Sequence, residues 1–252
     1  MTYKALFLDL DGTTVDHFSN QPSIRIITAI SKIKKKMHVC LATGRLFFQA
    51  QPVIEKLGIS GYCVVANGIQ IYDPRTKSIC KETAIDPKDI AGTYSILKKY
   101  SANIHSFNGI DEIIYLEKDK KRKILNFYIP KIEKNKIDPL TDELNAFPQV
   151  TVHKMVINEN DYAAVEICHA TGTKQYGILE VAKMLGVTAA EIVGVGDGYN
   201  DFPLLLACGL KFAMGNAVPE LKEIADFVTP PVDRDGVAVV IEKFLLPLLE
   251  KT

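Results

Sequence analysis

Short apolar runs that each end in polar residues constrain the fold of this chain more than any other feature. The first covers residues 3–10, and its length and lack of polar alternation are typical of a strand buried on both faces of a parallel sheet. Apolar residues then recur at helical spacing from Ser23, and a second run covers 38–42. Strand, helix and strand in this order predict a βαβ unit with a right-handed crossover.

This alternation continues beyond the first unit but is interrupted in the middle of the chain. A helix is expected at 47–57 and a strand at 62–66, and Asn67 with Gly68 indicates a tight turn of positive φ into a strand at 69–72. From about residue 78 to 170, strands and helices follow without regular order. The helices expected there are 87–100 and 139–146, and the strands are 104–107, 112–116, 150–157 and 163–167.

The regular alternation resumes after residue 171. Helices are expected at 174–185, from residue 200 and at 237–249, and strands at 191–195 and 210–213. The chain is therefore predicted to be an α/β protein. Residues 1–77 and 171–252 would form a doubly wound, mainly parallel sheet of the Rossmann-like kind, and residues 78–170 a smaller, inserted α+β domain.

Composition narrows the class of protein. With 252 residues and 47% apolar content the chain can bury a core without staples, and its five cysteines, which include no Cys-x-x-Cys pair, are expected to be small buried side chains. Its 30 basic residues balance 30 acidic ones, so no nucleic-acid or anionic-membrane partner is expected. No apolar run is long enough for a membrane span. We expect a cytoplasmic protein, either a monomer or a homodimer.

Polar residues gather where the predicted parallel strands end. This is the edge at which open α/β sheets bind their ligands. The residues are Asp9, Asp11 and Gly12 after the first strand, Thr43, Gly44 and Arg45 after the second, Lys174 at the helix that follows the insertion, and Asp197, Asn200 and Asp201 after the strand at 191–195.

Taken one at a time, these residues have ordinary structural explanations. An Asp-x-Asp-Gly sequence is a common turn, Thr43 can cap a helix, and Lys174 can be a solvated lysine in a first helical turn. Taken together they are harder to explain in this way, because carboxylates at one sheet edge repel one another unless a cation lies among them. A hard divalent cation with oxygen ligands is expected there, and Mg²⁺ is favoured over Ca²⁺.

Four ordered motifs resemble the signatures of the haloacid dehalogenase superfamily of aspartate-nucleophile phosphotransferases. Leu-Asp-Leu-Asp-Gly-Thr at 8–13 resembles the first signature, and Leu-Ala-Thr-Gly-Arg at 41–45 resembles the second. Lys174 stands where the third belongs, and Gly-Asp-Gly-Tyr-Asn-Asp at 196–201 resembles the fourth. The chain is thus identified as a member of this superfamily.

Two shorter motifs, Met-Gly-Asn-Ala at 214–217 and Ala-Asp at 225–226, are typical of the Cof-type branch, whose members are phosphatases with a type 2 cap. The resemblance covers about residues 3–72 and 160–246. It implies a Mg²⁺-dependent phosphomonoester hydrolase that acts on a small phosphorylated metabolite, a sugar phosphate or a cofactor phosphate, through an aspartyl-phosphate. The insertion is short for this branch, which leaves phosphoglycolate, sucrose-phosphate and mannosyl-phosphoglycerate phosphatases open as relatives.

The resemblance assigns catalytic roles to four matching positions. Asp9 is implied as the nucleophile, and Asp11 as the group that protonates the leaving alkoxide and then takes a proton from water. The acid role leads us to expect surroundings that favour the protonated carboxyl of Asp11. Thr43 is implied as a hydrogen-bond donor to the phosphoryl group, and Lys174 as the cation that neutralises charge on Asp9 and the phosphate.

The resemblance also implies which residues hold the metal and the substrate. Mg²⁺ would be bound by Asp9, the backbone carbonyl of Asp11 and Asp197, with Asp201 and Asn200 acting through water or orienting Lys174. The implied substrate contacts are Gly12, Thr43, Gly44, Arg45, Lys174 and Asn200.

Substrate choice is expected to depend on the insertion. Its candidate substrate contacts are His105, His153, Glu166 and His169, although such residues are more often packed or on the surface. Segment 118–136 holds eight Lys or Arg against two acids, a net charge of +6. Such a run is usually a solvated face. Alternatively, it draws phosphorylated substrates toward the site, an effect that salt would weaken.

Two other functions remain open from the sequence. A phosphosugar mutase resembling phosphomannomutase has a similar fold and cap, and its products are what distinguish it from a phosphatase. A phospho-accepting binding module resembling a receiver domain would be shorter, would lack the insertion, and would carry its acceptor aspartate after a later strand. The hydrolase therefore explains more of the chain than either alternative.

Overall fold

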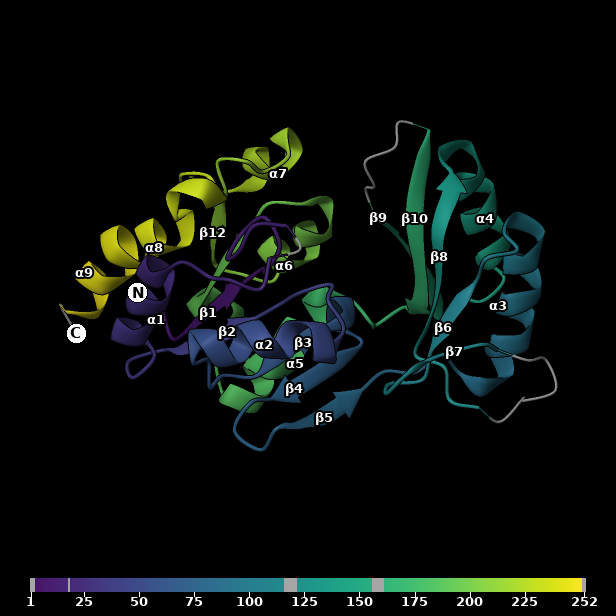
Figure 1. Cartoon of the computed structure of the whole chain (residues 1–252), viewed down its shortest axis with the longest axis horizontal. Helices are drawn as coiled ribbons and strands as arrows, with labels where there is room; N and C mark the ends of the chain where they lie inside the picture. Colours follow the sequence, from purple (N-terminus) through teal and green to yellow (C-terminus); the bar gives the residue numbers. More distant parts are fainter. Residues whose placement is uncertain (1–2, 18, 116–121, 156–160, 251–252) are drawn as a thin grey trace. The chain divides into compact units, whose positions relative to one another are not determined.

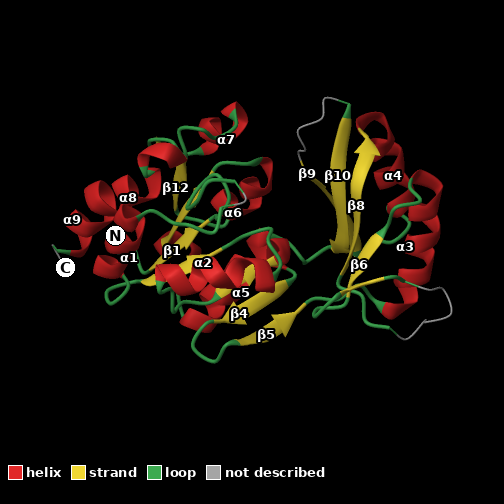
Figure 2. Cartoon of the chain, viewed as in Figure 1, coloured by secondary structure: helices red, strands yellow, loops and turns green. Residues whose placement is uncertain are grey.

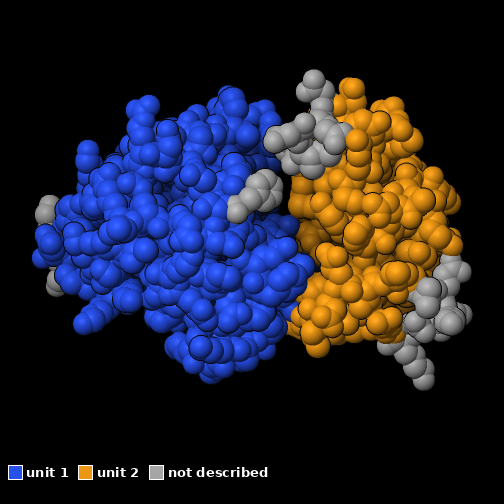
Figure 3. Space-filling view, in the orientation of Figure 1, with its two compact units in different colours: residues 1–81, 173–252 blue, residues 82–172 orange. Residues whose placement is uncertain are grey.

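The structure, a computed structural model, describes residues 3–17, 19–115, 122–155 and 161–250 (Figure 1). The chain divides into two compact units, coloured separately in Figure 3. Residues 1–81 with 173–252 are here called the core unit, and residues 82–172 the cap unit. These bounds differ by a few residues from those expected, because strand β5 (Ser78–Glu82) continues a sheet of the core unit.

A parallel sheet with the strand order β13-β12-β11-β1-β2 forms the centre of the core unit. Its strands are β1 (Ala5–Leu8), β2 (His38–Leu41), β11 (Ile192–Gly196), β12 (Leu210–Ala213) and β13 (Phe227–Val228). Leu8 lies opposite both Leu41 and Val195. The carboxyl ends of these three adjacent strands, β11, β1 and β2, are therefore level, and the residues after them start from one edge of the sheet.

Helices cover both faces of this sheet. α1 (Ile24–Ile33) packs against α2 (Phe47–Leu57) and α8 (Gly236–Val240), whereas α5 (Lys174–Leu185) packs against α6 (Phe202–Leu206). α7 (Pro219–Ile224) follows β12, and a π-helical turn (Ile241–Leu245) joins α8 to α9 (Leu246–Leu249). None of the helices that the structure describes is long and apolar enough to cross a membrane.

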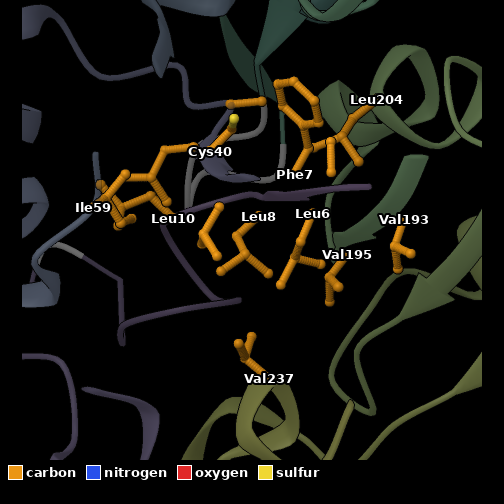
Figure 4. Close-up of a cluster of buried hydrophobic side chains, with 14 of the residues drawn as sticks. Leu6, Phe7, Leu8, Leu10, Cys40, Ile59, Val193, Val195, Leu204 and Val237 are labelled. Carbon is orange, nitrogen blue, oxygen red and sulfur yellow. The ribbon is translucent and has the colours of Figure 1, made fainter. Parts of the chain in front are cut away.

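The side chains of β1 show why both faces are covered. They alternate in direction, so that Phe7 points toward Leu204 of α6, while Leu6 and Leu8 point toward Val237 of α8 (Figure 4). Each of these residues is fully buried. A strand that buries both faces in this way requires helices on both sides. The predicted doubly wound α/β fold is confirmed.

A small sheet of β3 (Cys63–Val65), β4 (Gln70–Asp73) and β5 contains the predicted hairpin, since β3 and β4 pair antiparallel. Its turn is longer than the two residues expected, because Val65 pairs with Gln70. Ala66, Asn67 and Gly68 all have positive φ, at 49°, 53° and 109°. Positive φ is uncommon for alanine, although asparagine adopts it more readily, and residues in such uncommon conformations cluster at functional sites.

The cap unit is an antiparallel sheet with the order β7-β6-β8-β10-β9, one face of which packs against α3 (Pro87–Tyr100) and α4 (Ile137–Leu144) (Figure 2). Its strands are β6 (His105–Phe107), β7 (Glu112–Ile113), β8 (Asn126–Glu133), β9 (Val150–Met155) and β10 (Tyr162–His169). Part of the strands expected at 112–116 and 150–157 lies outside the described residues.

Strand β8, central in this sheet, was not predicted. Pro130 and Lys131 obscure the buried residues Phe127, Ile129 and Ile132. The pairing with β10 changes register between Ile129 and Ile132, where β8 has one residue more than its partner. This bulge accommodates Pro130, which has no N–H for the ladder. Part of the basic segment, residues 118–121, lies outside the described residues.

The five cysteines are free, and burial decides their chemistry. Four of them (Cys40, Cys63, Cys168 and Cys208) are buried as expected, and burial raises the pKa of Cys63 to about 12. Cys80 is exposed, contrary to the expectation, because β5 is the edge strand of its sheet. The buried thiols are structural side chains, since a thiol that resists ionisation is a poor nucleophile.

Candidate active site

A buried lysine joins two carboxylates at the edge where the central strands end. The Nζ atom of Lys174 lies 2.6 Å from Oδ1 of Asp9 and 2.7 Å from Oδ1 of Asp201. The exposed fractions of the three residues are 2%, 4% and 0%. Burial alone lowers the pKa of Lys174, but the charges of Asp201 and Asp9 outweigh this effect and hold that pKa above its usual range.

The start of α5 places Lys174 in this cluster. Thr173 caps the helix, because its hydroxyl oxygen accepts a hydrogen bond from the backbone N–H of Tyr176 (3.3 Å). The turn between β3 and β4 closes on the same point. A Cβ on Gly68 would lie 2.0 Å from the carbonyl oxygen of Thr173, so only glycine allows this approach.

Asp197 directly follows the strand β11 and completes the cluster. Its Oδ1 accepts from the hydroxyl of Thr13 (2.9 Å), and its Oδ2 accepts from Nδ2 of Asn216 (3.2 Å). Asp201 stabilises the same loop, because its Oδ2 accepts from the backbone N–H groups of Asp197 and Gly198, both at 2.9 Å. Both oxygens of Asp201 are thus engaged by the protein, which fits an orienting role better than direct metal ligation.

The charge of the cluster favours a divalent cation. Asp9, Asp197 and Asp201 each offer an oxygen within 4.8 Å of the others, and Lys174 balances one of their three charges. Burial and then the charge of Asp201 hold the pKa of Asp9 well above its usual range. The same two causes raise the pKa of Asp197 to about 6. An all-oxygen donor set with excess negative charge fits Mg²⁺.

Asp11 faces a different partner. Nε and Nη2 of Arg45 lie 2.8 and 2.5 Å from its two carboxylate oxygens. Arg45 also donates to Oδ1 of Asn20 (2.5 Å) and to the carbonyl of Ser19 (2.8 Å). Arg45, expected as a phosphate contact, instead holds Asp11. Both carboxyl oxygens of Asp11 thus accept from one guanidinium, which is not the environment expected for a proton donor.

The remaining predicted residues are three that are in close contact at this edge and one, Asn200, that is exposed. Thr43 is buried, and its hydroxyl oxygen accepts from the N–H of Arg45 (3.1 Å), which leaves its own proton to donate. Gly12 has a φ of +77°, and a Cβ there would lie 2.3 Å from Oδ2 of Asp197. A Cβ on Gly44 would lie 3.0 Å from Oδ1 of Asn67. Asn200 is exposed, and in the described part of the chain it makes no hydrogen bond to the cluster.

Sequence reasoning missed three residues at this edge. Thr13 and Asn216 hold the two oxygens of Asp197, and Asn67 lies beside Gly44 in the strained turn. Signals for the first two were present, because Thr13 belongs to the first motif and Asn216 to Met-Gly-Asn-Ala. Neither signal says which atom the side chain contacts.

Three of the four candidate residues of the insertion share one row of the cap sheet. The pairing places His105 opposite Tyr128, Tyr128 opposite Glu166, and Glu166 opposite His153, across β6, β8, β10 and β9. Directly opposite residues point to the same face of a sheet. His169 is not in this row, and its Nδ1 lies 2.8 Å from the hydroxyl of Thr171.

Comparison with known proteins identifies the family of the chain. The family model of haloacid dehalogenase-like hydrolases matches residues 6–161 and 107–241. YkrA of Bacillus subtilis (strain 168) is 30% identical, with 96% of this chain and 98% of that protein aligned. The HMP-PP phosphatase of Serratia proteamaculans (strain 568) is 26% identical over 88% and 87% of the two chains.

A solved structure extends the likeness to three dimensions. The subclass IIB sugar phosphatase BT4131 superposes with a TM-score of 0.79 at 20% identity, over 96% of this chain and 98% of that one. At this identity the likeness concerns the fold. The family match and the 30% identical relative confirm the resemblance seen in the four motifs. The chain belongs to the haloacid dehalogenase-like hydrolases.

Proposed function

We propose that the protein is a Mg²⁺-dependent phosphatase that hydrolyses a small phosphorylated metabolite through an aspartyl-phosphate on Asp9. The observation that carries the proposal is the buried ion pair of Asp9 and Lys174 inside the cluster of three carboxylates. A carboxylate held against an ammonium group in a site with surplus negative charge suits attack on phosphorus once a divalent cation is bound.

The reaction requires two displacements. In the first, an oxygen of Asp9 bonds to phosphorus while the bond to the alcohol oxygen breaks, and Asp11 gives that oxygen a proton. In the second, water attacks the phosphorus, Asp11 takes its proton, and the bond to Asp9 breaks to release inorganic phosphate. Arg45 holds the carboxylate of Asp11 in the structure, so this ion pair must open before Asp11 can act as an acid.

The other residues bind and neutralise the phosphoryl group. Thr43 has a hydroxyl proton available for a phosphoryl oxygen, and Lys174 supplies a fixed positive charge. Asp9, Asp197 and the backbone carbonyl of Asp11 would hold Mg²⁺, with Asp201 orienting Lys174. When bound, the cation screens the repulsion between the carboxylate and the phosphate dianion.

The names of the relatives support a small substrate. One is an HMP-PP phosphatase and another is a sugar phosphatase, so a phosphorylated metabolite is proposed here as well. The row of His105, Tyr128, Glu166 and His153 in the cap unit supplies the polar side chains on which substrate choice is proposed to depend. Its carboxylate and imidazoles suit hydroxyl or amino groups.

Phosphate release from p-nitrophenyl phosphate tests the proposal. The wild-type protein should release phosphate with Mg²⁺ and not after EDTA treatment, and Asp9→Asn should be at least about a thousandfold slower. The exposed Asp233→Asn variant is the matched control and should keep the wild-type rate. Equal rates for wild type and Asp9→Asn would refute the proposal. With sugar phosphates, free phosphate indicates hydrolysis, whereas isomerised sugar phosphate would indicate a mutase.

A further inference from the structure

Asn216 connects three segments that are distant in the sequence. Its Nδ2 donates to the carbonyl of Gly12 (2.8 Å) and to Oδ2 of Asp197 (3.2 Å), and its Oδ1 accepts from the N–H of Val232 (2.9 Å). The amide therefore bridges the loop after β1, the loop after β11 and the turn before α8. Two of these three loops supply the proposed cation ligands.

The orientation of this amide is determined by its partners. A backbone N–H can only donate, so the atom facing Val232 must be the oxygen. The NH₂ group then faces two acceptors, a carbonyl and a carboxylate. The loop that carries it is closely packed, because a Cβ on Gly215 would lie 2.7 Å from the backbone N of Pro231. Lys222 also donates to the carbonyl of Gly215 (2.7 Å).

We propose that Asn216 is a positioning residue for the cation site, setting the carboxylate of Asp197 relative to the Asp11–Gly12 peptide. The inference rests on the proposed function and concerns how tightly the cation is bound. Among the described residues, no hydrogen bond joins Asn216 to Asp9. It acts through Asp197, and through the peptide whose carbonyl, on Asp11, is the other proposed ligand.

The contacts of Asp197 explain why Asn216 matters for cation binding. A carboxylate has about four lone-pair sites. Thr13 occupies one on Oδ1, and Asn216 occupies one on Oδ2. These two hydrogen bonds hold the plane of the carboxylate from both sides, and each oxygen keeps a second lone pair for a cation. Loss of such a supporting hydrogen bond typically weakens metal binding by about 10-fold to 100-fold.

Calorimetric titration with Mg²⁺ tests this directly. The Kd for Mg²⁺ of Asn216→Ala should rise by about 10-fold to 100-fold over wild type, and Asn216→Ser, which keeps a shorter donor, should fall between them. At saturating Mg²⁺ the kcat of both variants should return to within a few fold of wild type, because the nucleophile is untouched. If Asn216→Ala does not fold, Asn216→Ser carries the comparison.

Lys222→Met is the matched control. It removes a hydrogen bond to the same loop without touching Asp197, so its Kd for Mg²⁺ should stay at the wild-type value even if its Tm falls. A Kd for Asn216→Ala within twofold of wild type, an equal weakening in Lys222→Met, or no Mg²⁺ binding by wild type would each overturn the inference. Failure of wild type to release phosphate would instead overturn the proposed function, since the Kd is measured without substrate.

Discussion

A lysine side chain with an exposed fraction of 2% requires charged partners, because an isolated buried ammonium costs several kcal/mol. Lys174 has two, Asp9 and Asp201, which between them carry one charge more than it balances. Asp197 adds a further carboxylate with no ammonium of its own within the cluster. At the scale of single residues, the site therefore holds excess buried negative charge, which a bound cation would balance.

This excess charge predicts how stability depends on pH without metal. The pKa of Asp197 is about 6 in the folded protein and 3.8 as its ordinary value. As pH rises from about 4 to about 6, the unfolded chain loses its proton first, so the free energy of unfolding falls in this window, by about 2 to 3 kcal/mol from this group. The raised pKa of Asp9 acts in the same direction.

Urea denaturation in EDTA measures this effect. Asp197→Asn should match wild type near pH 4 and be more stable by about 2 kcal/mol at pH 7, because the amide cannot ionise. Mg²⁺ should raise the Tm of wild type more at pH 7.5 than at pH 5, and should do little for the variant. A difference between the two proteins that did not grow with pH would contradict the prediction.

At the scale of elements, Lys174 is placed by a contact between a turn and the end of a helix. The β3–β4 turn meets the first residues of α5 at Gly68, which has a φ of +109° and almost touches the carbonyl of Thr173. At the other end, α5 stops at Gly186, which has a φ of +66° and open space around it. Both glycines have positive φ, but only at Gly68 does the neighbouring segment also leave no room for a Cβ.

Alanine substitutions separate these two requirements. Gly186→Ala should cost about 1 kcal/mol, the strain of a left-handed alanine. Gly68→Ala should cost at least about 3 kcal/mol, because its Cβ must displace backbone as well. It should also lower kcat, since the start of α5 carries Lys174. Urea denaturation and phosphate release measure both effects, and equal stability costs for the two variants would show that the close approach is unimportant.

At the scale of the whole molecule, the core unit is built from two separate segments of the chain, whereas the cap unit is built from one. The core sheet needs both ends of the chain, because β1 pairs with β2 on one side and with β11 on the other. The cap unit is a single segment, and its buried residues, such as Phe127, Ile167 and Leu140, form a cluster separate from that of the core.

Fragments of the chain therefore have different expected stabilities. Residues 82–172 expressed alone should show a cooperative thermal transition by circular dichroism, since the segment retains its own sheet and both of its helices. Residues 1–81 alone should not, because β1 then lacks β11 and the helices of one sheet face. A non-cooperative cap fragment would mean that the cap cluster is not sufficient for folding.

The periodic spacing of apolar residues is a local property of the sequence, and it was sufficient to predict most of the helices and strands. α2, α3 and α5 begin and end at the residues that apolar spacing predicts. Each helix buries one face, so its apolar residues recur every three to four positions in its own sequence. The order of the four motifs likewise placed Asp9, Lys174 and Asp197 at one sheet edge. β8 was missed, because a strand that pairs with neighbours on both sides tolerates a lysine and a proline that count against a strand in local reasoning.

The partners of individual atoms depend on packing between distant segments. Arg45 reaches Asp11 across 34 residues, and Asn216 reaches Gly12 across 204. Which donor meets which acceptor follows from strand register and from how closely loops approach, as at Gly68 and Gly215. The spacing of apolar residues along the sequence indicates only which side chains of a helix or strand are buried. It therefore predicts the elements and the edge where the site lies, whereas the folded core unit determines which hydrogen bonds hold Asp11 and Asp197 in place.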